Sequence, residues 1–90
     1  MKKLASVVEV EGEGLVGLLG QKVTVFCMNY IYTGVLAGVN TNDILLEDPR
    51  IVYETGAFSD KKFADAQSIG SKALYIRTSA IESYAVLPKE

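Results

Sequence analysis

The sequence contains no histidine and only one cysteine, and these scarcities restrict its chemistry. Cys27 cannot form a disulfide within the chain, and without histidine it has no imidazole base to make it a nucleophile. A lone cysteine among strand-forming residues is most often a small hydrophobe, so we expect Cys27 to be buried and unreactive. Clusters of metal ligands are equally lacking. The sequence therefore predicts a protein that is not an enzyme and that has no metal or cofactor site.

Long apolar runs and an excess of basic residues are also missing. No stretch approaches the roughly 20 apolar residues that cross a bilayer. Three acidic residues, Glu9, Glu11 and Glu13, interrupt an apolar start that would otherwise look like a secretion signal, so we expect a soluble, cytoplasmic protein without a membrane partner. The formal net charge of −2 lacks the basic footprint of a protein that captures nucleic acid by charge alone.

The chain is short but rich in apolar residues. Its 90 residues predict a single domain, 1–90, and a domain of this size has a marginal core. Yet 49% of the residues are hydrophobic, which is more apolar side chain than a small domain can enclose. We therefore expect another subunit to cover part of it.

Two blocks of strand-forming residues, 22–48 and 73–86, predict a mainly β protein. The first block contains three predicted strands and the second contains two, over residues 22–29, 32–40, 44–48, 72–77 and 81–86. Gly34 and Gly38 permit sharp bending of the second strand, as a small closed barrel needs. Pro49 interrupts the third strand, which then continues extended to about Glu54, and such a proline is tolerated at a bulge, an edge or a turn.

The remaining segments are predicted to surround this barrel. Residues 5–11 alternate valine with glutamate and predict an extra edge strand. Residues 15–19 predict one or two helical turns, with Leu15, Leu18 and Leu19 on one face and Gly20 as the stop. Residues 55–71 predict a long variable loop with at most a helical turn at 64–67. We expect its apolar side chains, Phe58, Phe63 and Ile69, to attach part of it to the barrel.

Together the two blocks resemble the paired motifs of the Sm/LSm family, to which bacterial Hfq also belongs. Gly34 is followed by the apolar Leu36, and Asn40 stands six positions after Gly34 where the family usually has aspartate. In the second motif, Ile76-Arg77-Thr78-Ser79 stands where the family has apolar-Arg-Gly-Asn. The resemblance implies an all-β fold: a strongly bent, five-stranded, SH3-like barrel with a short N-terminal helix.

The resemblance also implies partners and a site. Sm-like subunits form rings, so we expect a homo-oligomer of about five to seven copies in which strand 72–77 pairs with strand 81–86 of the next copy. Single-stranded RNA is the implied ligand, held near the pore. The candidate RNA-binding residues are Asn40, Asn42, Arg77, Thr78 and Ser79.

The candidate residues also have structural explanations, and the chain departs from the family at some positions. Asn40 and Asn42 are ordinary turn residues, and Arg77 could pair with Asp43. Asn42 replaces a base-stacking residue, and Ile44 replaces an asparagine. Four functions follow in decreasing order: a ring that binds single-stranded RNA or a nucleotide weakly, a scaffolding ring without RNA, an isolated SH3-like adaptor, and an enzyme.

Overall fold

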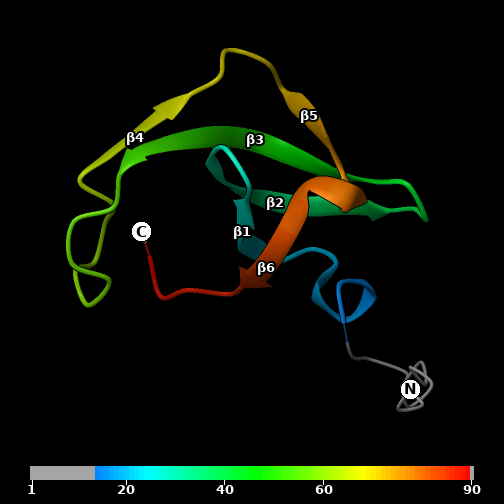
Figure 1. Ribbon diagram of the computed structural model, residues 1–90, viewed down its shortest axis with the longest axis horizontal. Helices are drawn as coiled ribbons and strands as arrows, with labels where there is room; N and C mark the ends of the chain where they lie inside the picture. Colours follow the sequence, from blue (N-terminus) through cyan, green and yellow to red (C-terminus); the bar gives the residue numbers. More distant parts are fainter. Residues whose placement is uncertain (1–13, 90) are drawn as a thin grey trace, which may run out of the picture.

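The computed structural model describes residues 14–89, which form one strongly bent antiparallel sheet (Figure 1). Its strands run in the order β4-β3-β2-β1-β6, and β5 pairs with β3 as well. The strands are β1 (Lys22–Cys27), β2 (Ile31–Val39), β3 (Asp43–Glu54), β4 (Asp65–Ser68), β5 (Ala73–Arg77) and β6 (Ile81–Ala85). Two 3-10 helices, η1 (Val16–Leu18) and η2 (Thr78–Ala80), complete the fold. The predicted β architecture with a short N-terminal helix is confirmed, and the predicted strand at 5–11 lies outside the described residues.

Strand β3 is the central element, because it pairs with β2, β4 and β5. Between the pairs Thr33↔Arg50 and Val35↔Glu47, β3 advances three residues while β2 advances two. The extra residue makes a β-bulge, with Asp48 in the left-handed region at φ 50°. The strand therefore runs through the proline instead of stopping there.

The predicted loop 55–71 is wrong over Asp65–Ser68, which form strand β4. The suggested helical turn at 64–67 is wrong for the same reason, since Ile51 pairs with Gln67 and Val52 with Ala66. This short polar segment has no strand periodicity of its own, and the exposed ladder of β3 supplies its hydrogen bonds. The sheet therefore has six strands rather than five, because β5 pairs with the first half of β3 and β4 pairs with its second half.

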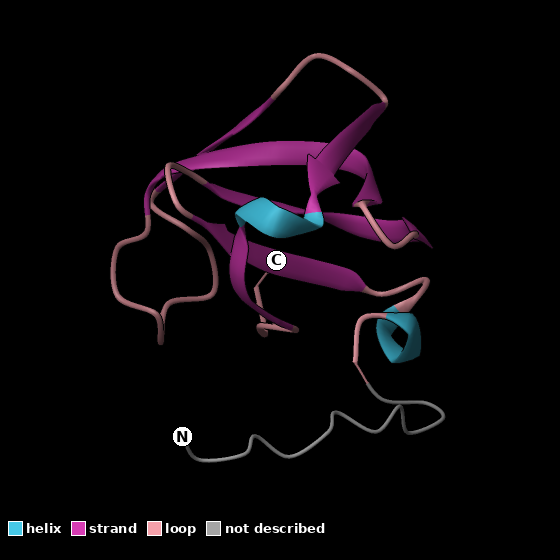
Figure 2. Ribbon diagram, turned by 45° about the vertical axis from the view of Figure 1, so that its right-hand side comes forward, coloured by secondary structure: helices cyan, strands magenta, loops and turns pink. Residues whose placement is uncertain are grey.

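The core lies between the curled strands, and η1 sits at one end of them (Figure 2). Leu15 and Leu18 pack against the core, as predicted, but Leu19 is exposed. Gly20 has φ 88° and ends this turn. The buried apolar residues are Val23, Val25, Leu36, Ile44, Leu46, Val52 and Ile76. Ten large hydrophobic side chains in the described residues remain exposed, so a single copy leaves much apolar surface in water.

Candidate functional site

The turn between β2 and β3 contains two of the candidate residues. The Asn40 backbone N–H donates to the Asp43 carbonyl oxygen at 2.8 Å. The Asn40 side-chain amide also donates to Asp43 Oδ1 at 3.1 Å. Asn40 thus stabilises this turn, which is the structural role expected for an asparagine there. Asn42 is exposed at the tip of the same turn.

The helix η2 docks directly onto this turn. The Thr78 backbone N–H donates to the Asn42 carbonyl oxygen at 2.9 Å. Its hydroxyl donates to the Thr41 carbonyl oxygen, also at 2.9 Å. Two segments that are 37 residues apart in the sequence are thereby joined. The Thr78 hydroxyl is already engaged, whereas Ser79 beside it is exposed.

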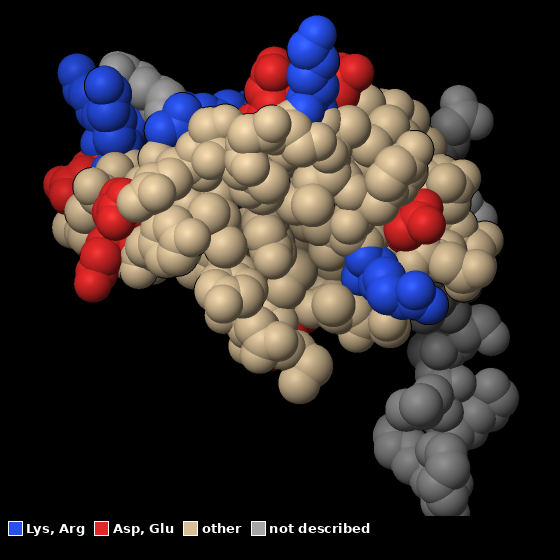
Figure 3. All heavy atoms as spheres, turned by 90° about the horizontal axis from the view of Figure 1, so that it is seen from above, with Lys and Arg blue, Asp and Glu red and all other residues tan. Residues whose placement is uncertain are grey.

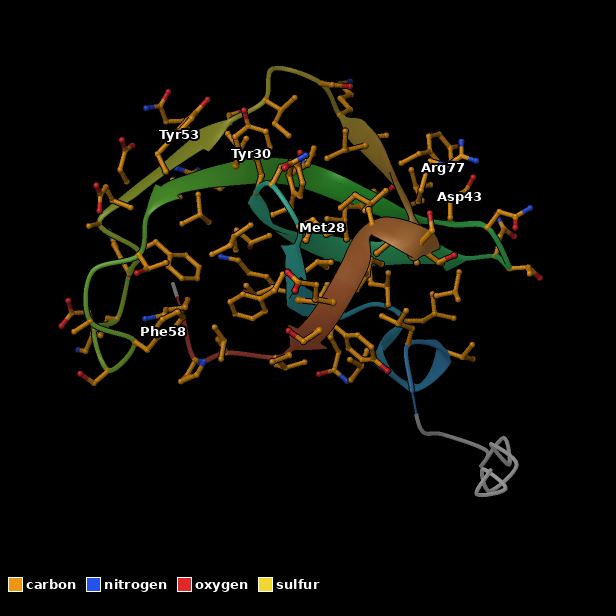
Figure 4. The ribbon with its side chains drawn as sticks, viewed as in Figure 1. Met28, Tyr30, Asp43, Tyr53, Phe58 and Arg77 are labelled. Carbon is orange, nitrogen blue, oxygen red and sulfur yellow. The ribbon has the colours of Figure 1, made fainter. Side chains whose placement is uncertain are left out.

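Arg77 lies on the same end of the sheet, opposite Asp43 in the β3–β5 ladder. Figure 4 shows the two side chains next to each other, beside the β2–β3 turn. Arg77 is exposed, so its guanidinium can turn toward a ligand. The structure thus places the candidate residues on two adjacent turns. Their contact with RNA remains a prediction.

Ile44, at the position where the resemblance to the Sm/LSm family would place an asparagine, is 0% exposed and belongs to the core. A side chain in this position cannot touch a ligand at the surface. This end of the sheet therefore offers amides, a hydroxyl and one guanidinium, without an aromatic platform at Asn42.

Cys27 is half-buried, so the prediction of a fully buried thiol is wrong for a single copy. It lines a groove of about 380 Å³ beside β5, together with Met28, Tyr30, Tyr75 and Ile76 among others. Burial, followed by the negative charge of Glu82, raises the pKa of the Cys27 thiol above its ordinary value of 9.0. Tyr75 and Met28 are 65% and 77% exposed, so the groove is apolar and open to water.

A second feature, two adjoining basic cavities, was missed by the sequence analysis. Their volumes are about 600 and 370 Å³, and both are lined by Lys22 and Arg50. Lys72 lines the larger cavity, and Lys62 lines the smaller. These four residues come from β1, β3 and two loops. No sequence spacing indicates them, because only the fold brings them together.

The smaller cavity is also lined by a buried threonine. Thr33 lines it, is 3% exposed, and has no hydrogen-bond partner for its Oγ1 among the described residues. A buried polar group without a partner costs about 1–3 kcal/mol. An unpaired group of this kind in a native structure is explained by a bound water or ion, by a functional role, or by strain.

Charged groups are distributed unevenly over the surface. In Figure 3, one face has a broad uncharged middle, with basic and acidic side chains at its margins. Within residues 14–89, no group of three or more histidine, cysteine, aspartate or glutamate side chains could hold a metal ion. No helix in this range is long and apolar enough to cross a membrane.

The comparisons with known proteins identify the fold. No family model matches the sequence, and no curated protein matches it either. Among solved structures, a heptameric archaeal Sm protein superposes with a TM-score of 0.64 at 16% identity, over 82% of this chain and 96% of that one. The SmAP1 heptamer of P. aerophilum gives 0.63 at 17%, over 82% and 88%. The Sm protein of Pyrococcus abyssii, in complex with a uridine heptamer, gives 0.56 at 15%, over 79% and 89%. The chain therefore has the Sm fold.

Proposed function

We propose that this Sm-fold chain is the subunit of a closed homo-oligomeric ring that binds single-stranded RNA weakly. The observation that carries the ring is the pair of free strand edges. Among the described residues, β5 pairs only with β3, and β6 pairs only with β1. Helix η2 separates them, so their outer edges are available to neighbouring copies. Pairing of β5 with β6 of the next copy is a head-to-tail contact, which closes into a ring.

Apolar surface next to both edges supports the same pairing. The groove beside β5 exposes Met28, Tyr30 and Tyr75. On the other partner, Tyr84 of β6 and Val86 just after it are 38% and 47% exposed. Burying these side chains against a neighbouring copy would add stability that the small core of one copy lacks. Two of the similar solved structures are heptamers, and about five to seven copies would fit a ring of this kind.

RNA binding is supported by the two adjacent turns. Exposed Asn42, Arg77 and Ser79 can hydrogen-bond to unstacked bases or phosphates. One of the similar structures, at 15% identity, contains a uridine heptamer. Affinity should nevertheless be low, because the lost stacking is worth about 1–3 kcal/mol per base and the net charge is −2.

A scaffolding ring without RNA is the second candidate. It is favoured by the buried Ile44 and by the Thr78 hydroxyl, which already donates to Thr41. Both features reduce the number of groups that could contact a base. In this case the ring would form, and the two turns would serve only to hold β3 and η2 together.

One experiment on assembly and one on binding test these functions. Light scattering should give a ring mass for the wild type, a monomer mass for Tyr75→Glu, and a ring mass for the control Val16→Glu, whose side chain is 55% exposed on η1. A monomeric wild type would refute the ring.

Fluorescence anisotropy with uridine-rich and adenine-rich oligonucleotides should show micromolar or weaker binding, which Arg77→Ala abolishes. No binding at any salt concentration would favour the scaffold.

A further inference from the structure

The two basic cavities form one cleft, which we call the bulge cleft. It is lined by Lys22, Arg50, Lys62, Lys72 and Thr33, and by Asp48 of the β3 bulge. It lies along the middle of β3, whereas the two turns with Asn42 and Arg77 lie at the end where β3 begins. The bulge cleft is therefore a different place from the proposed RNA site.

Charge is concentrated in the bulge cleft. Four basic side chains line it against one carboxylate, Asp48, although the whole chain has a net charge of −2. Lys22, Lys62 and Lys72 are exposed, so their ammonium groups can turn toward a bound anion. Arg50 is held in place, because its Nη2 donates to the Ala66 carbonyl oxygen at 2.6 Å. An anion here would meet one fixed and three adjustable cations.

The wall of the bulge cleft is built by backbone bonds. The Ile69 N–H donates to the Pro49 carbonyl oxygen at 3.2 Å, and the Asp48 N–H donates to the Lys72 carbonyl oxygen at 3.1 Å. These bonds fix the connection between β4 and β5 over the bulge. Ser68, the last residue of β4, and Ser71 of this connection line the larger cavity. The Ser71 hydroxyl already donates to the Ala73 carbonyl oxygen, whereas the Ser68 hydroxyl accepts from the Gly70 N–H and can still donate to a ligand. The cleft is thus largely formed before any ligand arrives.

Thr33 gives an independent indication of a ligand. Its hydroxyl group is buried, has no partner among residues 14–89, and lines the same cleft as Lys22 and Arg50. Thr33 is opposite Arg50 in the β2–β3 ladder, and a hydroxyl donor next to this cationic residue suits an oxygen-rich anion. Phe63 is the one aromatic residue of the cleft, and its ring already contacts Phe58 and the Lys89 ammonium group. A base has no free platform there.

We propose that the bulge cleft binds phosphoryl groups. They could belong to a free diphosphate-bearing compound or to the backbone of a single strand, and both present the same chemistry to the lysines, Arg50 and Thr33. The cavity volumes suit a ligand of this size. Because no base is read, a polynucleotide would bind here without sequence preference.

Titration calorimetry of the wild-type assembly with inorganic pyrophosphate tests the site. We expect saturable binding that weakens at least about tenfold in the double variant Lys22→Gln/Lys72→Gln. The control Lys61→Gln removes a charge at an exposed residue that lines neither cavity, and it should change the dissociation constant less than about twofold. Arg77→Gln, measured separately, should weaken RNA binding and leave pyrophosphate binding in place, so either proposal can fail alone.

Thr33→Val removes only the buried hydroxyl group. It should weaken pyrophosphate binding about fivefold while the urea midpoint of unfolding stays the same or rises, because the lost hydroxyl had no protein partner. Mixed-sequence RNA is the second probe. If it binds while pyrophosphate does not, and the lysine and Thr33 variants weaken its binding as described, the site exists and its ligand is a polynucleotide. The proposal is overturned if neither probe binds, or if the control weakens binding as much as the lysine variant.

Discussion

At the scale of single residues, Gly34 permits a close approach of β2 and β3. A Cβ atom there would lie 2.9 Å from the Glu47 carbonyl oxygen and 3.1 Å from Leu46 Cβ. Both neighbours belong to β3 just before its bulge, and Leu46 is fully buried. The glycine that the sequence analysis associated with bending is therefore needed for β3 to pack against β2.

Gly34→Ala should lower the free energy of unfolding by about 1–3 kcal/mol, because the added methyl group overpacks this contact. Gly38→Ala is the control, since its Cβ would meet Leu45 at 3.4 Å, an ordinary contact. Urea denaturation followed by circular dichroism would measure both variants. If the free energy of unfolding fell equally in the two variants, the strands would have moved apart at Gly34 without a loss of stability.

At the scale of elements, the C-terminal tail is attached to the connection between β3 and β4. The Lys89 ammonium group donates to the carbonyl oxygens of Phe58 at 2.8 Å and Asp60 at 2.7 Å. It also lies 5.0 Å from the centre of the Phe63 ring. The ring of Phe58 contacts Phe26 of β1. The β3–β4 connection is therefore held by the C-terminal tail and by strand β1.

Lys89→Ala should release the tail and lower the free energy of unfolding by about 1 kcal/mol, since Lys89 is half-buried and partly screened by water. Hydrogen exchange should accelerate at the Asp60 amide, which donates to the Ala57 carbonyl oxygen. Lys61→Ala, a change at an exposed neighbour, should leave this rate unaltered. Unchanged exchange in Lys89→Ala would mean that the loop holds its shape without the lysine.

At the scale of the whole molecule, one copy is incompletely covered. The half-buried Cys27 and the exposed Tyr75 share a groove that the proposed neighbour would close. A thiol that is accessible in a single copy would then be hidden in the ring. Cys27 is thus a natural reporter of assembly.

Thiol alkylation should be slow in the wild-type ring and faster in the Tyr75→Glu monomer. In the monomer, the rate should keep rising with pH above 9.0, because burial and Glu82 raise the pKa of Cys27 and delay formation of the reactive thiolate. Mass spectrometry over a pH series would follow the reaction. Rapid, stoichiometric labelling of the wild type near neutral pH would contradict both the coverage and the raised pKa.

Much of the fold could be predicted, and the errors have physical causes. The strands with strong apolar or β-branched patterns, β1, β2 and β5, were found within a few residues of their observed bounds. Strand β4 was missed because Asp65-Ala-Gln-Ser68 carries no pattern, and only pairing with β3 makes it a strand. The candidate residues at the two turns do lie together, while their role in binding RNA stays a prediction.

By itself, the sequence determined the β class and the surplus of apolar residues, because period-two patterns and composition are local properties of the chain, and the resemblance to the Sm/LSm family added the bent barrel. Only the tertiary structure decided that β3 passes Pro49 by a bulge, that Cys27 is half-buried, and that Lys22 and Arg50 line two adjoining cavities, one with Lys72 and the other with Thr33. These features depend on contacts between residues far apart in the sequence, which no local pattern records.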